Sequence, residues 1–74
     1  RNVSDMTHAI ISDLVSNVSA DRLTQEEKIA VVEELDRRGT FLIKGAVSDV
    51  AAQLACSEAS IYRYLSMVNK RENR

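Results

Sequence analysis

The amino-acid sequence predicts an all-α fold, a small bundle of about four helices. The 74 residues include no proline and only two glycines, and residues of high helix propensity such as Ala, Leu, Glu and Arg are abundant. Apolar residues also recur at helical spacing along most of the chain. Because 45% of the residues are hydrophobic and 28% are charged, the composition is that of one folded globular domain.

The first helix is expected over Ser4–Val18. Ser4 suits the N-cap position, and Asp5 in the first turn favours the helix dipole. The apolar residues lie on one helical face, which either closes the domain core or forms a dimer contact. They are Met6, Ile10, Ile11, Leu14, Val15 and Val18.

The second helix carries the clearest start signal in the chain. Thr24 is followed three residues later by Glu27, which is the capping-box arrangement. Arg37 and Arg38 fall in the last turn, where cations suit the dipole, and Gly39 is expected to end the helix in a left-handed conformation. The buried stripe between these ends is expected to contain Ile29, Val32 and Leu35.

The link after this helix, Thr40–Lys44, is short and apolar. Its pattern does not separate a strand from a buried link. Because a single strand would have no partner, we expect an extended or irregular link that buries Phe41 and Ile43. Gly45 then gives the backbone the freedom to turn into the next helix.

Two short helices joined by a tight break follow, over Ala46–Leu54 and Glu58–Asn69, and the charged tail Lys70–Arg74 is expected to fray. The break forces the two helices to cross steeply, so a small residue is needed where they approach most closely. The order of apolar residues is that of a DNA-binding helix-turn-helix. The residues that fit this order are Val50, Ala51, Leu54, Cys56, Ile61 and Tyr64 or Leu65.

Ala55 occupies a turn position that is commonly glycine, because the backbone there tends to be left-handed. Alanine in that conformation costs on the order of 1 kcal/mol. Cys56 is expected to fill the gap between the helices as a small hydrophobe, and Ser57 suits the N-cap of the second helix.

The outward face of the second short helix is left over once the core is assigned. Arg63 could bind guanine with two hydrogen bonds or contact the backbone, and Glu58 could accept from cytosine or only support the helix N-terminus. Tyr62 either contacts DNA or belongs to the core. The candidate DNA contacts are Ser57, Glu58, Ala59, Ser60, Tyr62 and Arg63, and phosphate attraction is expected from Lys44, Arg37, Arg38 and Lys70.

Charge is divided along the chain. Residues 1–36 carry eight acidic and three basic residues, a net charge of −5, and residues 37–74 carry seven basic and three acidic residues, a net charge of +4. The positive half holds the helix-turn-helix, so a polyanion is expected to bind there.

Residues 23–65 resemble the C-terminal helix-turn-helix domain of YheO/DauR-like bacterial transcriptional regulators. The runs FLIKGAV at 41–47 and SEASIYRYL at 57–65 carry most of the resemblance, which covers 43 of the 74 residues. It implies sequence-specific DNA binding by a regulator whose upstream PAS-like sensor domain binds any small-molecule effector. We therefore expect residues 1–22 to be a linker and dimerisation helix and residues 23–74 to be the DNA-binding domain.

A homodimer is expected, because DNA readers of this kind usually pair to match palindromic half-sites. We favour dimer contacts through Met6, Ile10, Leu14 and Val18, with closure of the core as the alternative. A rival function is a helical protein-protein interaction module that no longer binds DNA, which Glu58 and the sequence pI of about 5.8 favour.

No catalytic residues, cofactor or metal are expected. His8 stands alone, and the single cysteine, Cys56, allows neither an internal disulfide nor a cysteine-based metal cluster. No nucleophile–base arrangement is visible, so we do not expect an enzyme. No apolar run approaches the roughly 20 residues that span a bilayer, and no secretory signal is visible. We expect a cytoplasmic protein with no membrane partner, and the start at Arg1 suggests a piece of a longer protein.

Overall fold

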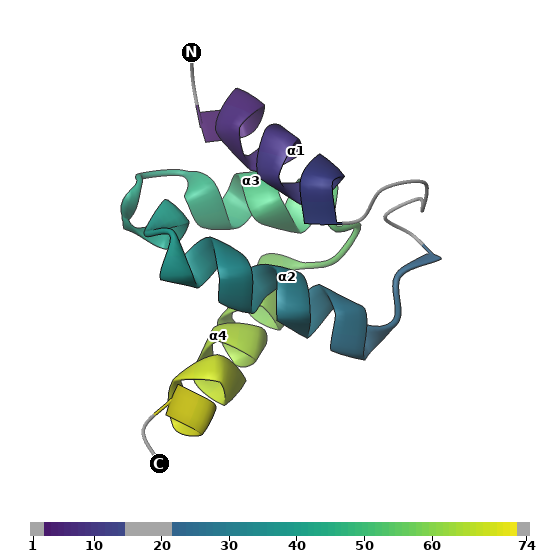
Figure 1. The fold of residues 1–74 in the computed structure, drawn as a ribbon, viewed down its shortest axis with the longest axis vertical. Coiled ribbons are helices and arrows are strands. Elements are labelled where there is room, and N and C mark those ends of the chain that lie inside the picture. Colours follow the sequence, from purple (N-terminus) through teal and green to yellow (C-terminus); the bar gives the residue numbers. More distant parts are fainter. Residues whose placement is uncertain (1–2, 15–21, 73–74) are drawn as a thin grey trace.

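A computed structural model describes residues 3–14 and 22–72. In that part of the chain, the fold consists of four α-helices with a 3-10 turn between the second and third, and no strand is present, which confirms the all-α prediction. The helices are α1 (Val3–Leu14), α2 (Gln25–Arg37), α3 (Ala46–Gln53) and α4 (Glu58–Glu72), with the 3-10 turn η2 at Thr40–Leu42 (Figure 1). Among these helices, none is long and apolar enough to cross a membrane.

The capping box of α2 forms as the sequence predicts. The Glu27 backbone N–H donates to Thr24 Oγ1 at 3.1 Å, and the Thr24 backbone N–H donates to Glu27 Oε1 at 2.8 Å. These bonds satisfy two backbone donors at the start of the helix. The expected left-handed stop is also confirmed, because Gly39 has φ 81°. The buried residues of α2 are Ile29, Val32 and Leu35, with Val31 in addition.

The link between α2 and α3 differs from the expected extended segment. The Leu42 N–H donates to Gly39 O and the Ile43 N–H donates to Thr40 O, each at 3.1 Å, and these bonds wind the link into η2. Thr40 is therefore buried, while Phe41 and Ile43 are only half-buried. Of the two alternatives, extended or irregular, the extended link is therefore wrong, and Phe41 and Ile43 are less buried than expected, since an i to i+3 turn does not alternate its side chains as a strand does.

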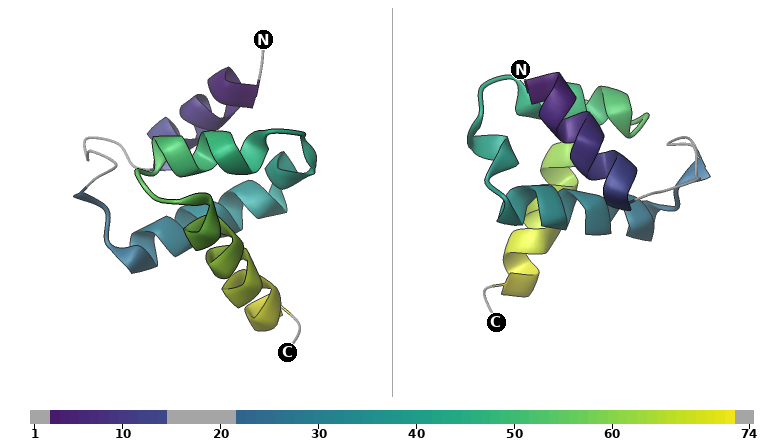
Figure 2. Two further views of the ribbon diagram at one scale, coloured as in Figure 1. Left: turned by 180° about the vertical axis from the view of Figure 1, so that it is seen from behind. Right: turned by 45° about the horizontal axis from the view of Figure 1, so that its top comes forward.

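In the helix-turn-helix, α3 and α4 pack closely at Ala51, as the sequence predicts. Val50, Leu54 and Ile61 are fully buried, and Ala51 is 4% exposed. Of the two alternatives for closing the core, Tyr64 is buried and Leu65 half-buried. In the left view of Figure 2, α4 (dark green to yellow) follows the turn and crosses α3 (green) at a steep angle.

The turn itself is strained where the sequence predicts strain. Ala55 has φ 56°, the one left-handed non-glycine residue in the described part of the chain. Cys56 is half-buried rather than enclosed, so it fills the gap only in part.

Both outer helices depart from their expected bounds. Helix α1 includes Val3, so Ser4 lies inside the helix and the expectation that it is the N-cap was wrong. Helix α4 continues to Glu72, so Lys70 and Arg71 are helical rather than frayed. The reason is that Val68 is fully buried and holds the C-terminal half of α4 in the core. The expected positions Val15 and Val18 lie outside the described residues.

Helix α1 packs across α3 through a buried polar cluster. The side chain of Thr7 is fully buried and donates to Asp49 Oδ2 of α3. Gln53 Nε2, one turn further along α3, donates to Thr7 Oγ1 and to Asp49 Oδ2, the latter at 2.9 Å. Ile11 is buried beside this cluster. The cluster fixes the position of α1 against the first helix of the helix-turn-helix.

Replacing Ala51 with leucine is expected to destabilise the protein by about 1–3 kcal/mol, because the larger side chain must force α3 and α4 apart. Ala52→Leu is the matched control, since Ala52 is the next residue of α3 and is exposed. Urea unfolding followed by circular dichroism measures both. Equal unfolding free energies for the two variants would contradict a close approach at Ala51.

Replacing Ala55 with glycine is expected to stabilise the protein by about 0.5–1 kcal/mol, because glycine adopts a positive φ without a steric penalty. The same change at Ala30, an exposed residue within α2, should destabilise it by about 1 kcal/mol. Opposite signs in thermal unfolding therefore test the left-handed turn. A loss of stability in both variants would rule that conformation out.

Candidate nucleic-acid interface

The N-terminus of α4 is built by two serines. The Ser60 backbone N–H donates to Ser57 Oγ at 3.1 Å, and the Ile61 N–H donates to Ser57 O at 3.2 Å. This is the expected N-cap at Ser57. The Ser57 hydroxyl also donates to Ser60 Oγ at 3.1 Å. The side chains of both serines that the sequence predicts as DNA contacts therefore form hydrogen bonds within the first turn of α4.

The outward side of α4 forms one continuous exposed stripe. Tyr62 is 59% exposed, whereas Tyr64 is buried, so Tyr62 does not belong to the core. The exposed positions recur every three or four residues, as one face of a helix requires. Ser66 and Asn69 extend the stripe, and although both lie within the predicted helix, neither is among the DNA contacts that the sequence predicts. The stripe consists of Glu58, Ala59, Tyr62, Arg63, Ser66, Asn69 and Lys70.

Arg63 is exposed and is held by neighbours on its own helix. Its guanidinium carbon lies 5.6 Å from the centroid of the Tyr64 ring, and Nη2 donates to Ser60 Oγ at 3.4 Å. Neither contact neutralises its charge, and Arg63 makes no ion pair with a carboxylate that the structure describes. The guanidinium therefore keeps hydrogen-bond donors for an external acceptor.

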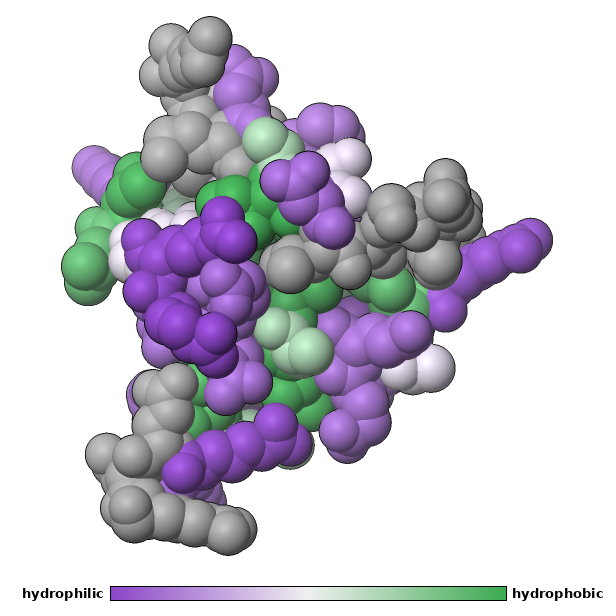
Figure 3. Space-filling view, in the orientation of Figure 1, coloured by the Kyte–Doolittle hydropathy of each residue, from purple (hydrophilic) through white to green (hydrophobic). Residues whose placement is uncertain are grey.

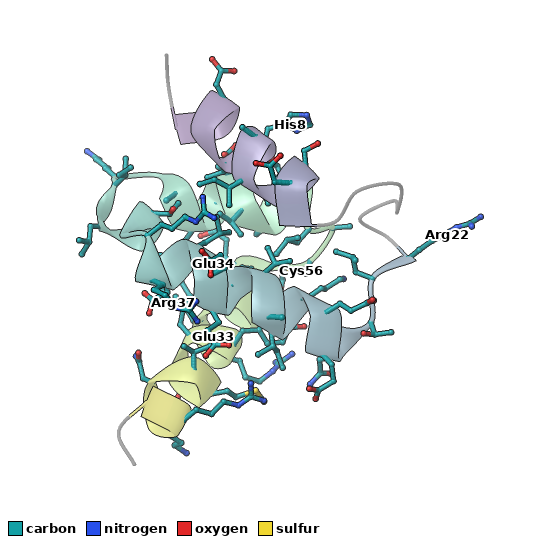
Figure 4. The ribbon with its side chains drawn as sticks, viewed as in Figure 1. His8, Arg22, Glu33, Glu34, Arg37 and Cys56 are labelled. Carbon is teal, nitrogen blue, oxygen red and sulfur yellow. The ribbon has the colours of Figure 1, made fainter. Side chains whose placement is uncertain are left out.

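Arg37 and Arg38 are turned onto the acidic side chains of α2. Arg38 Nε lies 2.7 Å from Glu34 Oε2, and Arg37 Nη1 lies 2.8 Å from Glu34 Oε1, with Glu33 at 3.9 Å from Arg37. Figure 4 shows Glu33, Glu34 and Arg37 around the C-terminal half of α2, and Figure 3 shows hydrophilic residues over this part of the molecule. Both arginines are therefore already compensated by charge, unlike Arg63.

The Arg38 hydrogen bond lowers the pKa of Glu34 below its ordinary value, although burial acts in the opposite direction. The coulombic effects of Arg37 and Arg38 add to the lowering. Because the folded pKa is depressed, this carboxylate stabilises the fold above its ordinary pKa, and the contribution is lost as the pH falls through the folded value.

An open groove of about 390 Å³ lies between the α2–α3 link and the first turns of α4. It brings together three sequence-predicted residues, Lys44 from the α2–α3 link and Glu58 and Tyr62 from α4. Its apolar wall includes Leu42, which is 91% exposed and was not predicted as a surface feature. Lys70 lies outside this groove, two turns further along α4 than Arg63.

A family model described as an HTH domain matches residues 3–66. The chain belongs to this HTH domain family. The match begins in α1 and ends within α4, so it includes α1 together with the helix-turn-helix. No curated protein and no solved structure matches the chain.

Cys56 lies in the turn of the HTH domain as a free thiol. Its partial burial raises the pKa of the thiol, and the positive charges of Lys28 and Arg63 only partly oppose this. The thiol therefore stays protonated at neutral pH, which is typical of an unreactive cysteine.

The residues expected to form a dimer are only partly placed. Ile10 is half-buried and packs against the core, while the side chains of Met6 and Leu14, and all of Val18, lie outside the described residues. His8 is exposed on α1 (Figure 4). Within the described residues, no three His, Cys, Asp or Glu side chains gather closely enough to hold a metal ion.

Replacing Arg38 with alanine is expected to raise the pKa of Glu34 toward its ordinary value of 4.5, because the largest cause of the lowering is removed. Arg37→Ala should raise it less, because the effect of Arg37 on this pKa ranks below that of the Arg38 hydrogen bond, although Arg37 Nη1 also donates to Glu34 Oε1 at 2.8 Å. Carbon-detected NMR titration of the Glu34 carboxyl in each variant measures the pKa. A larger rise in Arg37→Ala than in Arg38→Ala would contradict this assignment.

Proposed function

We propose that this chain is the DNA-binding domain of a transcription regulator and acts by placing α4 in the major groove of double-stranded DNA. The observation that carries the proposal is the exposed stripe of α4 within an HTH domain. A major groove admits a helix, and in HTH proteins the N-terminal residues of the second helix meet base edges. On α4 these residues are Glu58, Ala59, Tyr62 and Arg63, all of which are exposed.

The basic residues divide into two groups in this proposal. Arg63 contacts a base or phosphate directly, and Lys44 and Lys70 attract the flanking phosphates from the link and from the C-terminal half of α4. Ser57 and Ser60 act mainly by fixing the helix start, since their hydroxyls bond each other. Arg37 and Arg38 must break their ion pairs with Glu34 before they can bind a phosphate. We therefore expect these two arginines to contribute less to phosphate binding than Lys44, Arg63 and Lys70.

The regulator context rests on the resemblance of residues 23–65 to YheO/DauR-like bacterial regulators, to which the HTH family match adds support. We propose that an upstream PAS-like domain binds the effector, and that the DNA-binding domain itself needs no cofactor and catalyses no reaction. We also propose a cytoplasmic homodimer, with residues 1–22 as the linker helix that carries its contacts. Pairing would increase affinity, because a single small module buries little surface on DNA.

A protein-protein interaction module is the alternative function. It is favoured by Leu42, a leucine that is 91% exposed beside the groove, because large exposed apolar side chains are common at protein contacts. The net charge of −1 also favours it. We prefer DNA binding because residues 37–74 carry a net charge of +4, and because Lys44, Arg63 and Lys70 take part in none of the ion pairs among the described residues.

Arg63→Ala is expected to weaken binding to a short fluorescein-labelled DNA duplex by roughly fivefold or more, because it removes a donor to base or phosphate. Arg22→Ala is the matched control, since Arg22 is an exposed arginine that projects away from the helices (Figure 4). Fluorescence anisotropy over a series of salt concentrations measures both variants.

The logarithm of the binding constant should fall linearly with the logarithm of the salt concentration, with a shallower slope for Arg63→Ala than for the wild type. Absence of binding at low salt, or an equal loss in both arginine variants, would refute the proposal in favour of the interaction module.

A further inference from the structure

Glu58 is the one acidic residue among the α4 residues proposed to meet base edges, and the proposed function does not say what it binds. It is exposed in the first turn of α4, where a carboxylate suits the helix dipole. A carboxylate that faces DNA is repelled by the phosphates, however, and the loss grows as the helix enters the groove. If Glu58 served only to stabilise the start of α4, its negative charge would weaken the binding of α4 to DNA.

The protein itself does not neutralise this carboxylate. Lys44 lines the same groove as Glu58, yet the ion pairs among the described residues all lie on α2. Asp49, the other acid of the positive half whose side chain is described, is occupied by the side chains of Thr7 and Gln53. Glu58 consequently keeps its acceptor oxygens for an external donor.

The chemistry of the major groove limits what that donor is. An ionised carboxylate is an acceptor only, and the groove offers donors from the exocyclic amino groups of cytosine and adenine. Of these two bases, cytosine is the one that Glu and Asp side chains bind through its N4 amino group. Guanine and thymine offer no donor there and would place acceptor oxygens against Glu58.

We propose that Glu58 is a specificity-determining residue, whose carboxylate accepts a hydrogen bond from the N4 amino group of a cytosine in each half-site. The inference rests on the proposed function, because it requires α4 to lie in the major groove. Glu58 then opposes non-specific binding through phosphate repulsion and favours sites that carry cytosine at one position. The negative charge at the tip of α4 thereby improves discrimination rather than affinity.

Selection of duplexes from a random-sequence pool by the 74-residue chain, followed by sequencing, tests the inference. The wild type should enrich cytosine at one position by about tenfold over the other bases. Glu58→Ala should lose the preference at that position alone. Glu58→Gln should change it to adenine, because glutamine both donates to N7 and accepts from N6 of that base.

Glu26→Gln is the matched control, because Glu26 is an exposed acid in the first turn of α2. It should leave every base preference unchanged, and the unfolding temperatures of both Gln variants separate a dipole effect from recognition. If the chain enriches no sequence and binds no duplex, the proposed function fails and the inference fails with it. If the wild type enriches a sequence and both Glu58 variants retain every preference, DNA binding stands and the role of Glu58 is wrong.

Discussion

The close crossing of α3 and α4 is the constraint on which the rest of the structure depends. Ala51 has no side chain beyond Cβ, so the two helices approach closely enough for Leu54 and Ile61 to be fully buried. The crossing requires a sharp turn, which the chain makes with a left-handed Ala55. The strain of that residue, on the order of 1 kcal/mol, is offset because each large core residue contributes about 1.5–3 kcal/mol when buried. Packing thus enforces a turn that local preference disfavours.

The steep crossing also determines which charges are available to a partner. It directs Ile61, Tyr64 and Val68 into the core and leaves the opposite side of α4 exposed from Glu58 to Lys70. Meanwhile Arg37 and Arg38 lie beside acidic residues one turn back on α2 and pair with them. The net charge of residues 37–74 counts Arg37 and Arg38 in full, although both are already paired with acidic residues. It therefore overstates how much these two arginines add to the attraction of a polyanion. Arg63, by contrast, is exposed and makes no ion pair with a described carboxylate.

Local signals were sufficient to predict much of this fold. The capping box at Thr24, the stop at Gly39 and the apolar order from Val50 to Ile61 each depend on residues close together in sequence, and each was confirmed. The 3-10 turn at Thr40–Leu42 was not predicted, because an apolar run does not distinguish such a turn from an extended or irregular segment. The length of α4 was also underestimated, since its last turns depend on burial of Val68 against other helices. Of the candidate site, the outward face of α4 was predictable from helical spacing, whereas the pairing of Arg38 with Glu34 depends on rotamers that a sequence does not specify.

The contact between α1 and α3 shows most clearly what a sequence pattern leaves out. Thr7 gives no signal in a hydrophobic pattern, because it is a polar residue that lies between Met6 and His8. In the fold it is fully buried and bonded to Asp49 and Gln53. Buried polar groups that lose their partners cost about 1–3 kcal/mol each, so separating α1 from α3 would be opposed by this cluster as well as by the exposure of Ile11. Helix α1 is therefore held in a fixed position on the first helix of the helix-turn-helix, and the family match, which begins at residue 3, includes it. Any contact that α1 makes with a second copy of the chain must use the side of the helix that faces away from Thr7.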